Sequence, residues 1–394
     1  MKQKYRIDTR LTHLASSPRE HWGFVNPPSY RGSTVLYDSV RTMNQQTSDT
    51  LRRSLPSYGR FGTPTCRALE DAFAELEGGY AAIGTSCGLS AITTAILGFV
   101  EAGDHILVSD SVYVPTRSFC NKMLSKLGIE TEYYDPRIGR EIASLVRPTT
   151  RLIFMESPGT ATFEVQDVPA ITGVARERGV ITMIDNTWST PLFFRPLEHS
   201  VDVSIHSASK YITGSADSLL GIIVCNESSY EPVRKSSIAV GQYAGADDVL
   251  AGLRGLRTLA VRLRRHQEQA MALCEWLRKR PEVETIIYPA LPEHPDHELW
   301  KRDFDGASGL FSVVLKAGAP LDFEAMLDGM EIFGLGHGYG GYESLIVPVQ
   351  PGEYRHAPRW QAQQPLLRIH AGFEDLADLQ ADLEAGFQRL LHST

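Results

Sequence analysis

The fold class is predicted most directly from RLIFMESPGTATFEVQDVPAITGVARERGVITMIDN, residues 151–186. This stretch opens with RLIFMES (151–157) and closes with VITMIDN (180–186), two short runs of mostly apolar residues. Such runs are typical of buried strands, and we expect a helix at 168–178 between them. A strand, a helix and a second strand in this order predict two parallel strands of one sheet.

The same alternation extends in both directions, from about residue 65 to residue 230. We expect further strands at 105–110, 129–135, 201–207 and 219–225. Helices are expected at 65–76, near 114–127, and from Leu89 onward with Leu89, Ile92, Ile96 and Phe99 on one face. Short apolar strands separated by helices predict an α/β fold with a mostly parallel sheet and helices on both faces.

The two ends of the chain have different patterns. Residues 1 to about 60 are rich in Pro, Ser, Thr and Arg and show little periodicity, as expected of an arm that lies on a partner subunit. One long helix is expected from about 250 to 280, followed by strands at 309–316, 344–349 and 366–372 and a final helix. We therefore divide the chain into an arm (1–60), an α/β domain (61–250) and a smaller α+β domain (251–394).

Composition excludes several classes of protein. Asp+Glu total 47 against 39 Lys+Arg, a net charge of −8, and no basic block suggests a nucleic-acid surface. No apolar run approaches the ~18 residues of a membrane span, and MKQKYRIDTRLTH does not predict a secretory signal. The five cysteines are scattered without CxxC or metal-ligand spacing, so we expect a reducing cytoplasm and no metal.

Three local motifs are candidates for chemistry. Lys210 lies in SASKYITG (207–214), just after a predicted strand, where α/β folds bind ligands. Asp185 ends the predicted strand VITMI at the same sheet edge, and TSCGLSA (85–91) opens a helix whose N–H groups can bind an anion. Taken singly, each has a structural alternative: a solvated lysine, a capping aspartate and a plain turn.

Together these motifs suggest pyridoxal 5′-phosphate (PLP). A lysine amine can form a Schiff base with its aldehyde, a carboxylate can keep its ring nitrogen protonated, and backbone N–H groups with hydroxyls can hold its phosphate.

The chain resembles the PLP-dependent enzymes of Cys/Met metabolism, of fold type I, and is most similar to their bacterial cystathionine β-lyases. The resemblance covers nearly the whole length. It is carried by YGRFGTPT (58–65), ELEGG (75–79), EAGDHILVSDSVY (101–113), ESPGTATFEVQDVPAI (156–171), IDNTW (184–188), SASKY (207–211), RGLRTLAVRLRRH (254–266), WKRDFDGASGLFSVVLK (300–316), GGYESL (340–345) and LLRIHAGFEDL (366–376). It implies a large PLP-binding domain with a mostly parallel seven-stranded sheet and a smaller α+β domain.

The resemblance also implies roles for individual residues. Lys210 would form the Schiff base and later move protons at Cα, Asp185 would pair with the ring nitrogen, and Tyr113 would stack on the ring. The implied phosphate ligands are Gly88, Leu89, Ser207 and Ser209, with Tyr58 and Arg60 reaching the site of a neighbouring subunit. Arg368 would clamp the substrate carboxylate beside Tyr339. A dimer is then the smallest active unit, and the family favours a tetramer built from two dimers.

The implied reaction is α,β-elimination on a small amino-acid substrate. L-Cystathionine or a related S-substituted cysteine would give a thiol (homocysteine), pyruvate and ammonia, as in methionine biosynthesis. A racemase or epimerase, a γ-lyase, or a β/γ-replacement enzyme remains an alternative, because all share the same Cα carbanion. A catalytically silent binding protein on the same scaffold is a further alternative.

The chain departs from the β-lyase pattern at several positions. Phe61 replaces the second arginine of YGRRGT, Ser118 replaces a carboxylate, and Gly338 replaces a serine beside Tyr339. Because Phe61 and Ser118 remove charge where a distal zwitterion would bind, the natural substrate is less well defined than the cofactor. Arg117 and His337 are local novelties that could face a different substrate, although for Arg117 we expect solvent exposure.

Overall fold

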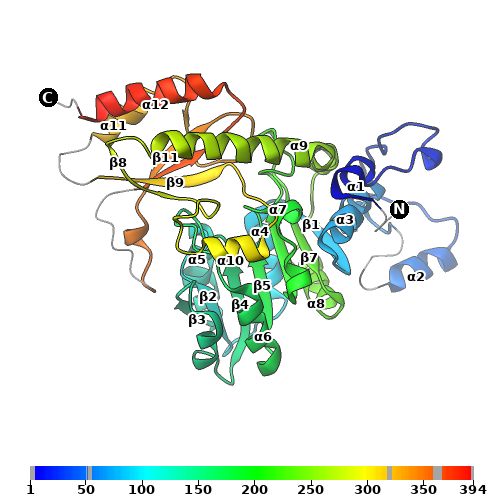
Figure 1. Cartoon of the computed structure of the whole chain (residues 1–394). Coiled ribbons are helices and arrows are strands. Elements are labelled where there is room, and N and C mark those ends of the chain that lie inside the picture. The colour runs from blue at the N-terminus through cyan, green and yellow to red at the C-terminus, as the bar shows by residue number, and fades with distance from the viewer. Residues whose placement is uncertain (1–4, 50, 52–55, 317–321, 358–365, 392–394) are drawn as a thin grey trace.

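A computed structural model of the chain describes residues 5–49, 51, 56–316, 322–357 and 366–391. Its helices are α1 (Ile7–His13), α2 (Val40–Ser48), α3 (Pro64–Glu77), α4 (Gly88–Leu97), α5 (Val114–Phe119), α6 (Val168–Arg178), α7 (Thr190–Phe193), α8 (Glu227–Ala239), α9 (Ala246–Leu277), α10 (His297–Asp303), α11 (Phe323–Asp328) and α12 (Leu376–Leu391). Figure 1 shows the long helix α9 extending from beside α1 toward α12 in the C-terminal part of the chain.

The larger sheet has seven strands in the order β1-β7-β6-β5-β4-β2-β3. They are β1 (Ala81–Thr85), β2 (His105–Ser109), β3 (Glu130–Tyr134), β4 (Thr150–Glu156), β5 (Ile181–Asp185), β6 (Val203–Ser207) and β7 (Gly221–Cys225). The pairs β3–β2, β2–β4, β4–β5 and β5–β6 are parallel, whereas β7 runs antiparallel to both β6 and β1. The expected mostly parallel seven-stranded sheet is confirmed.

Helices cover both faces of this sheet, because alternate residues of one strand enter different cores. Ile222 and Val224 of β7 pack in a cluster with Leu69 and Phe73 of α3, whereas Ile223 and Cys225 pack with residues of α4. A strand buried on both faces reads as a continuous apolar run, which is why β7 could be predicted.

The smaller sheet lies in the C-terminal part of the chain, in the order β10-β11-β12-β9-β8. Its strands are β8 (Val283–Ile287), β9 (Leu310–Leu315), β10 (Gly334–Leu335), β11 (Leu345–Val349) and β12 (Leu366–His370). Leu379, Leu383 and Phe387 of α12 are buried in the core that this sheet shares with α9. The predicted strands and final helix of this region are confirmed.

Several predicted elements need correction. The expected helix near 114–127 ends as an α-helix at Phe119 and continues as a π-helical turn, Cys120–Leu124. Helix α4 ends at Leu97, before Phe99, and Leu89 is 36% exposed instead of lying on the buried face. Strands β1 and β8 and helix α8 were not predicted.

The N-terminal segment has more structure than expected. Helix α1 packs on α9, with Leu11 buried and Asp8 in an ion pair with Arg264 at 2.8 Å. Beyond α1 the segment extends to one side (Figure 1), and Trp22 there is 96% exposed. In the described part of the chain, no helix is both long and apolar enough to cross a membrane.

Candidate active site

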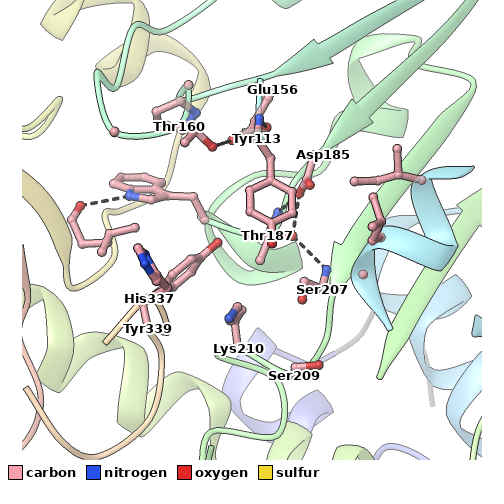
Figure 2. Close-up of a pocket in the computed structure, with 18 of the residues that line it drawn as sticks. Tyr113, Glu156, Thr160, Asp185, Thr187, Ser207, Ser209, Lys210, His337 and Tyr339 are labelled. Carbon is pink, nitrogen blue, oxygen red and sulfur yellow. Dashed lines mark hydrogen bonds between the residues drawn. The ribbon is translucent and has the colours of Figure 1, made fainter. Parts of the chain in front are cut away.

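A cavity of about 230 Å³ opens at the carboxyl ends of β4, β5 and β6 (Figure 2). Nine of the predicted site residues line it: Gly88, Leu89, Tyr113, Asp185, Ser207, Ser209, Lys210, Tyr339 and Arg368. The fold therefore brings together residues that are up to 280 positions apart in the sequence (368 − 88). Tyr58 and Arg60 are not among them and line a separate surface depression with Arg31 and Tyr243.

Lys210 lies in the turn that follows β6. Its backbone N–H donates to Ser207 O at 3.1 Å, and its carbonyl accepts from Gly214 N at 2.9 Å, so the turn is well fixed. The ammonium nitrogen lies 5.2 Å from the centre of the Tyr339 ring. Burial, and then the charge of Arg368, lower the pKa of Lys210. A lysine in this environment gives up its proton more readily than a lysine in water.

Asp185 is the last residue of β5 and is held by Thr187. Its Oδ1 accepts from Thr187 N at 2.9 Å and from the Thr187 hydroxyl at 2.5 Å. Burial raises the pKa of Asp185, and the Thr187 hydrogen bonds oppose that rise. Thr187 Oγ1 also accepts from Ser207 N at 2.8 Å, so one hydroxyl connects the ends of β5 and β6.

Glu156 is a second, partly buried acid in the cavity that was not predicted from the sequence. It ends β4 and pairs in register with Asp185 of β5. Its Oε2 accepts from Tyr113 N at 2.7 Å, and Oε1 accepts from the Thr160 hydroxyl. Burial and the charge of Asp185 raise the pKa of Glu156 well above its usual value. Its position was readable from the sequence, since it ends a strand parallel to that of Asp185.

The start of α4 forms one end of the cavity. A Cβ atom at Gly88 would lie 2.6 Å from Ser207 Cβ and 2.7 Å from Ser207 Oγ, so glycine is needed for the start of α4 to lie this close to the end of β6. The first N–H groups of a helix have no acceptor within it and attract anions. Ser209 Oγ donates to Leu220 O at 3.2 Å and accepts from Leu220 N at 2.8 Å, which leaves it one free lone pair.

The opposite wall comes from the C-terminal part of the chain. Arg368 of β12 donates to Gly338 O at 3.4 Å, and burial lowers its pKa. Gly340 has φ +83°, and a Cβ there would lie 2.6 Å from Tyr211 N, so the loop that carries Tyr339 presses directly against the Lys210 turn. Gly340 N donates to His370 Nε2 at 3.0 Å, which anchors this loop.

The structure corrects the expectation for Arg117 and places the other unusual residues. Arg117 is 5% exposed, because it pairs with Asp110 at 2.5 Å and its guanidinium lies 3.8 Å from the Tyr133 ring centre. The predicted solvent exposure of Arg117 was therefore wrong. Its side chain is stabilised by a buried carboxylate and an aromatic face instead of by water. His337 lines the cavity, whereas Phe61 and Ser118 do not.

Comparison with known proteins identifies the family. The sequence profile of the Cys/Met metabolism PLP-dependent enzymes matches residues 8–388. The chain belongs to this family. Cystathionine β-lyase MetC of Escherichia coli is 42% identical over 98% of this chain and 99% of its own. An L-alanine/L-glutamate racemase of Wolbachia pipientis is 38% identical over 94% of each chain.

Solved structures agree with this assignment. Cystathionine γ-synthase of Xanthomonas oryzae pv. oryzae, in complex with aminoacrylate and cysteine, superposes with a TM-score of 0.88. The two chains are 29% identical over 98% of this chain and 99% of the other. The protein is therefore a PLP-dependent enzyme of fold type I.

The cavity suits this family's cofactor. It contains a partly buried amine at Lys210, a partly buried carboxyl at Asp185, and the start of α4 at Gly88 packed beside Ser207. An amine, an acid and an anion-binding helix start are the three groups that PLP requires. The chemistry of the residues present therefore fits the cofactor.

Proposed function

We propose that the protein is a carbon–sulfur β-lyase acting on L-cystathionine or a related S-substituted cysteine. The observation that carries this proposal is the meeting of Lys210, Asp185 and Arg368 in one buried cavity, in a chain 42% identical to a cystathionine β-lyase. With water, the substrate would give a thiol, pyruvate and ammonia; cystathionine would give homocysteine.

Each residue has a definite proposed task. When bound, PLP supplies an electron sink for the charge that develops at the substrate Cα. Lys210 Nζ would hold the cofactor and then accept the Cα proton, and its lowered pKa favours the neutral amine that this requires. The fork of Arg368 would bind the substrate α-carboxylate, and Asp185 would face the ring nitrogen.

The remaining contacts would orient the cofactor. Tyr113 would cover the ring, with Tyr339 on the Lys210 side of the cavity. Gly88, the Leu89 N–H group, Ser207 and Ser209 would hold the phosphate. Tyr58 and Arg60 lie outside this cavity and would serve the site of a second subunit.

We also propose the organisation of the molecule. The arm (1–60) would contact a partner subunit, 61–250 would bind the cofactor, and 251–394 would form the second domain, in a dimer or a tetramer of two dimers. Exposed apolar side chains support the role of the arm: Trp22, Phe24, Val25, Leu36 and Val40. The five cysteines are free, which supports a reducing cytoplasm.

Product analysis tests the proposed reaction. Purified enzyme with PLP and L-cystathionine should release pyruvate and a free thiol in equal amounts. Lys210→Ala should abolish both and remove the visible absorption of bound coenzyme. Release of 2-oxobutyrate and cysteine would instead indicate a γ-lyase.

Racemisation is the second candidate function. It is favoured by the racemase relative and by Phe61 and Ser118, which stand where the β-lyase pattern has charged side chains. Incubation with L-alanine or L-glutamate, followed by chiral analysis, tests it. Appearance of the D-amino acid without pyruvate from any cysteine thioether would replace the lyase proposal.

A further inference from the structure

Glu156 is a partly buried acid that has no role in the proposed reaction. It lines the cavity, and its strand neighbour in register is Asp185, whereas Lys210 is the proposed proton acceptor. We propose that Glu156 is a positioning residue, which fixes Tyr113 over the cofactor site through the Tyr113 backbone N–H. This inference rests on the proposed function for the role of Tyr113.

The contacts of Glu156 join two loops at the sheet edge. Its Oε2 accepts from Tyr113 N at 2.7 Å, and its Oε1 accepts from the Thr160 hydroxyl. Thr160 N in turn donates to Ser111 O at 2.8 Å. The loop after β4 and the loop after β2 are therefore connected twice, and Glu156 makes the connection nearest the cavity.

Tyr113 depends on this backbone contact. The residue is 45% exposed, and its ring extends from the Glu156 side of the cavity toward Lys210 (Figure 2). Among the described residues, no hydrogen bond to its hydroxyl holds the ring in place. Tyr113 also directly precedes α5, so its backbone position sets the start of that helix. Movement of its N–H group would therefore move the ring.

Electrostatics indicate which protonation state of Glu156 accepts the hydrogen bond from Tyr113 N. The side chains of Glu156 and Asp185 end adjacent parallel strands, which lie about 4.8 Å apart. Two partly buried carboxylates on neighbouring strands in register repel each other when both are ionised, which favours a proton on one of them. Burial and then the Asp185 charge raise the pKa of Glu156 well above its usual value, which favours the protonated form of Glu156. A neutral carboxyl still accepts from Tyr113 N through its carbonyl oxygen.

Two substitutions distinguish the contribution of the side-chain length of Glu156 from that of its acidic group. Glu156→Gln keeps the length and an acceptor oxygen but removes the acid, whereas Glu156→Asp keeps the acid and shortens the side chain by one methylene. In the PLP-loaded enzyme we expect the Glu156→Gln variant to retain kcat/KM within about twofold of the wild-type value. We expect Glu156→Asp to lower kcat/KM by about tenfold or more, because the Tyr113 N–H is left without its acceptor.

Two further measurements identify Tyr113 as the group through which Glu156 acts. The circular dichroism band of bound coenzyme should change in Glu156→Asp and remain as in wild type in Glu156→Gln. In a Tyr113→Ala background, Glu156→Asp should lower kcat/KM by less than about twofold, because the positioned ring is already gone.

Two outcomes would overturn the inference. One is a Gln variant as impaired as the Asp variant, and the other is a full additional loss in the Tyr113→Ala background. The proposed function fails differently, by the absence of pyruvate from any cysteine thioether in the wild type. In that case the coenzyme dichroism of the Gln and Asp variants still decides the role of Glu156.

Discussion

At the scale of single residues, burial changes what the site's side chains can do. Lys210 and Arg368 lie in one cavity, and each has a pKa lowered by burial. For lysine this yields a base, whereas arginine stays charged because its pKa begins far higher. This difference supports the proposed roles of Lys210 as a proton carrier and of Arg368 as an anion clamp.

Arg368→Lys tests the anion clamp. Lysine keeps the positive charge but lacks the planar fork that binds a carboxylate at two points. We expect kcat/KM with the cysteine thioether to fall by about tenfold or more, mainly through a higher KM, as for the loss of a charged hydrogen bond. Steady-state kinetics measure this, with the half-exposed Arg302→Lys as the control. An unchanged KM would show that the substrate carboxylate binds elsewhere.

At the scale of elements, the site depends on close contacts between segments. Gly255 lies in the interior of α9, and a Cβ there would collide with the backbone oxygens of Ile212 and Thr213. These two residues follow Lys210 in its turn. The absence of a side chain at 255 thus lets the long helix support the turn that carries the reactive amine.

A matched pair of glycine substitutions tests this contact. Gly255→Ala should lower the melting temperature and weaken PLP binding, because overpacking against the backbone costs about 1–3 kcal/mol. Gly173 lies inside α6, where the nearest atom to a new Cβ is Arg140 Nη1 at 4.0 Å. Gly173→Ala should therefore be neutral or stabilise by up to about 1 kcal/mol, the helix propensity difference. Similar melting curves for both variants would contradict the argument.

At the scale of the whole molecule, one chain leaves two predicted site residues apart from the cavity. Tyr58 and Arg60 line a depression with Tyr243, and Arg60 donates to Ile238 O at 3.3 Å. A second copy of the chain would bring an equivalent pair to this site. The proposed active unit is therefore at least a dimer.

Mixing two inactive variants tests the dimer. Lys210→Ala and Arg60→Ala should each be inactive or nearly so. If Arg60 serves the partner's site, each mixed dimer has one site with neither defect, so equal mixing should restore about a quarter of wild-type activity. Pyruvate release after denaturation and refolding together measures this. Mixing two preparations of Lys210→Ala is the control, and no recovery would mean that Arg60 acts within its own chain.

Buried histidines predict the acid stability of the whole protein. Burial lowers the pKa of His266 to about 4 and that of His370 well below its usual value. Between about pH 6.5 and 4 the unfolded chain binds protons at these positions that the folded protein does not. Each histidine thus lowers the free energy of unfolding by up to about 1.4 kcal/mol for each unit by which the pH falls in this range.

His266→Asn tests this dependence. The asparagine amide can replace the donor to Ala371 O, which His266 Nδ1 contacts at 2.7 Å. The melting temperature of the variant should fall less than that of the wild type between pH 6.5 and pH 4, whatever its stability at neutral pH. The exposed His13→Asn should follow the wild-type slope. Parallel profiles for His266→Asn and wild type would contradict the assignment.

Local sequence pattern determined much of this protein. Several elements lie within two residues of their predicted places, because their apolar patterns extend over short stretches of sequence. They are the strands at 150–156, 181–185 and 203–207 and the helix at 168–178. The cofactor chemistry was also readable, since Lys210, Asp185 and the TSCGLSA turn each follow or open a predicted element.

Tertiary structure alone decided the rest. Strand β1 (AAIGT) consists mainly of small residues and owes its conformation to pairing with β7, a contact about 140 residues away in the sequence (225 − 81 = 144). The burial of Arg117 depends on Asp110 and Tyr133, and the raised pKa of Glu156 depends on its burial and on Asp185. Periodicity reports which face of an element is apolar, whereas charge state and exposure depend on groups that only the fold brings together.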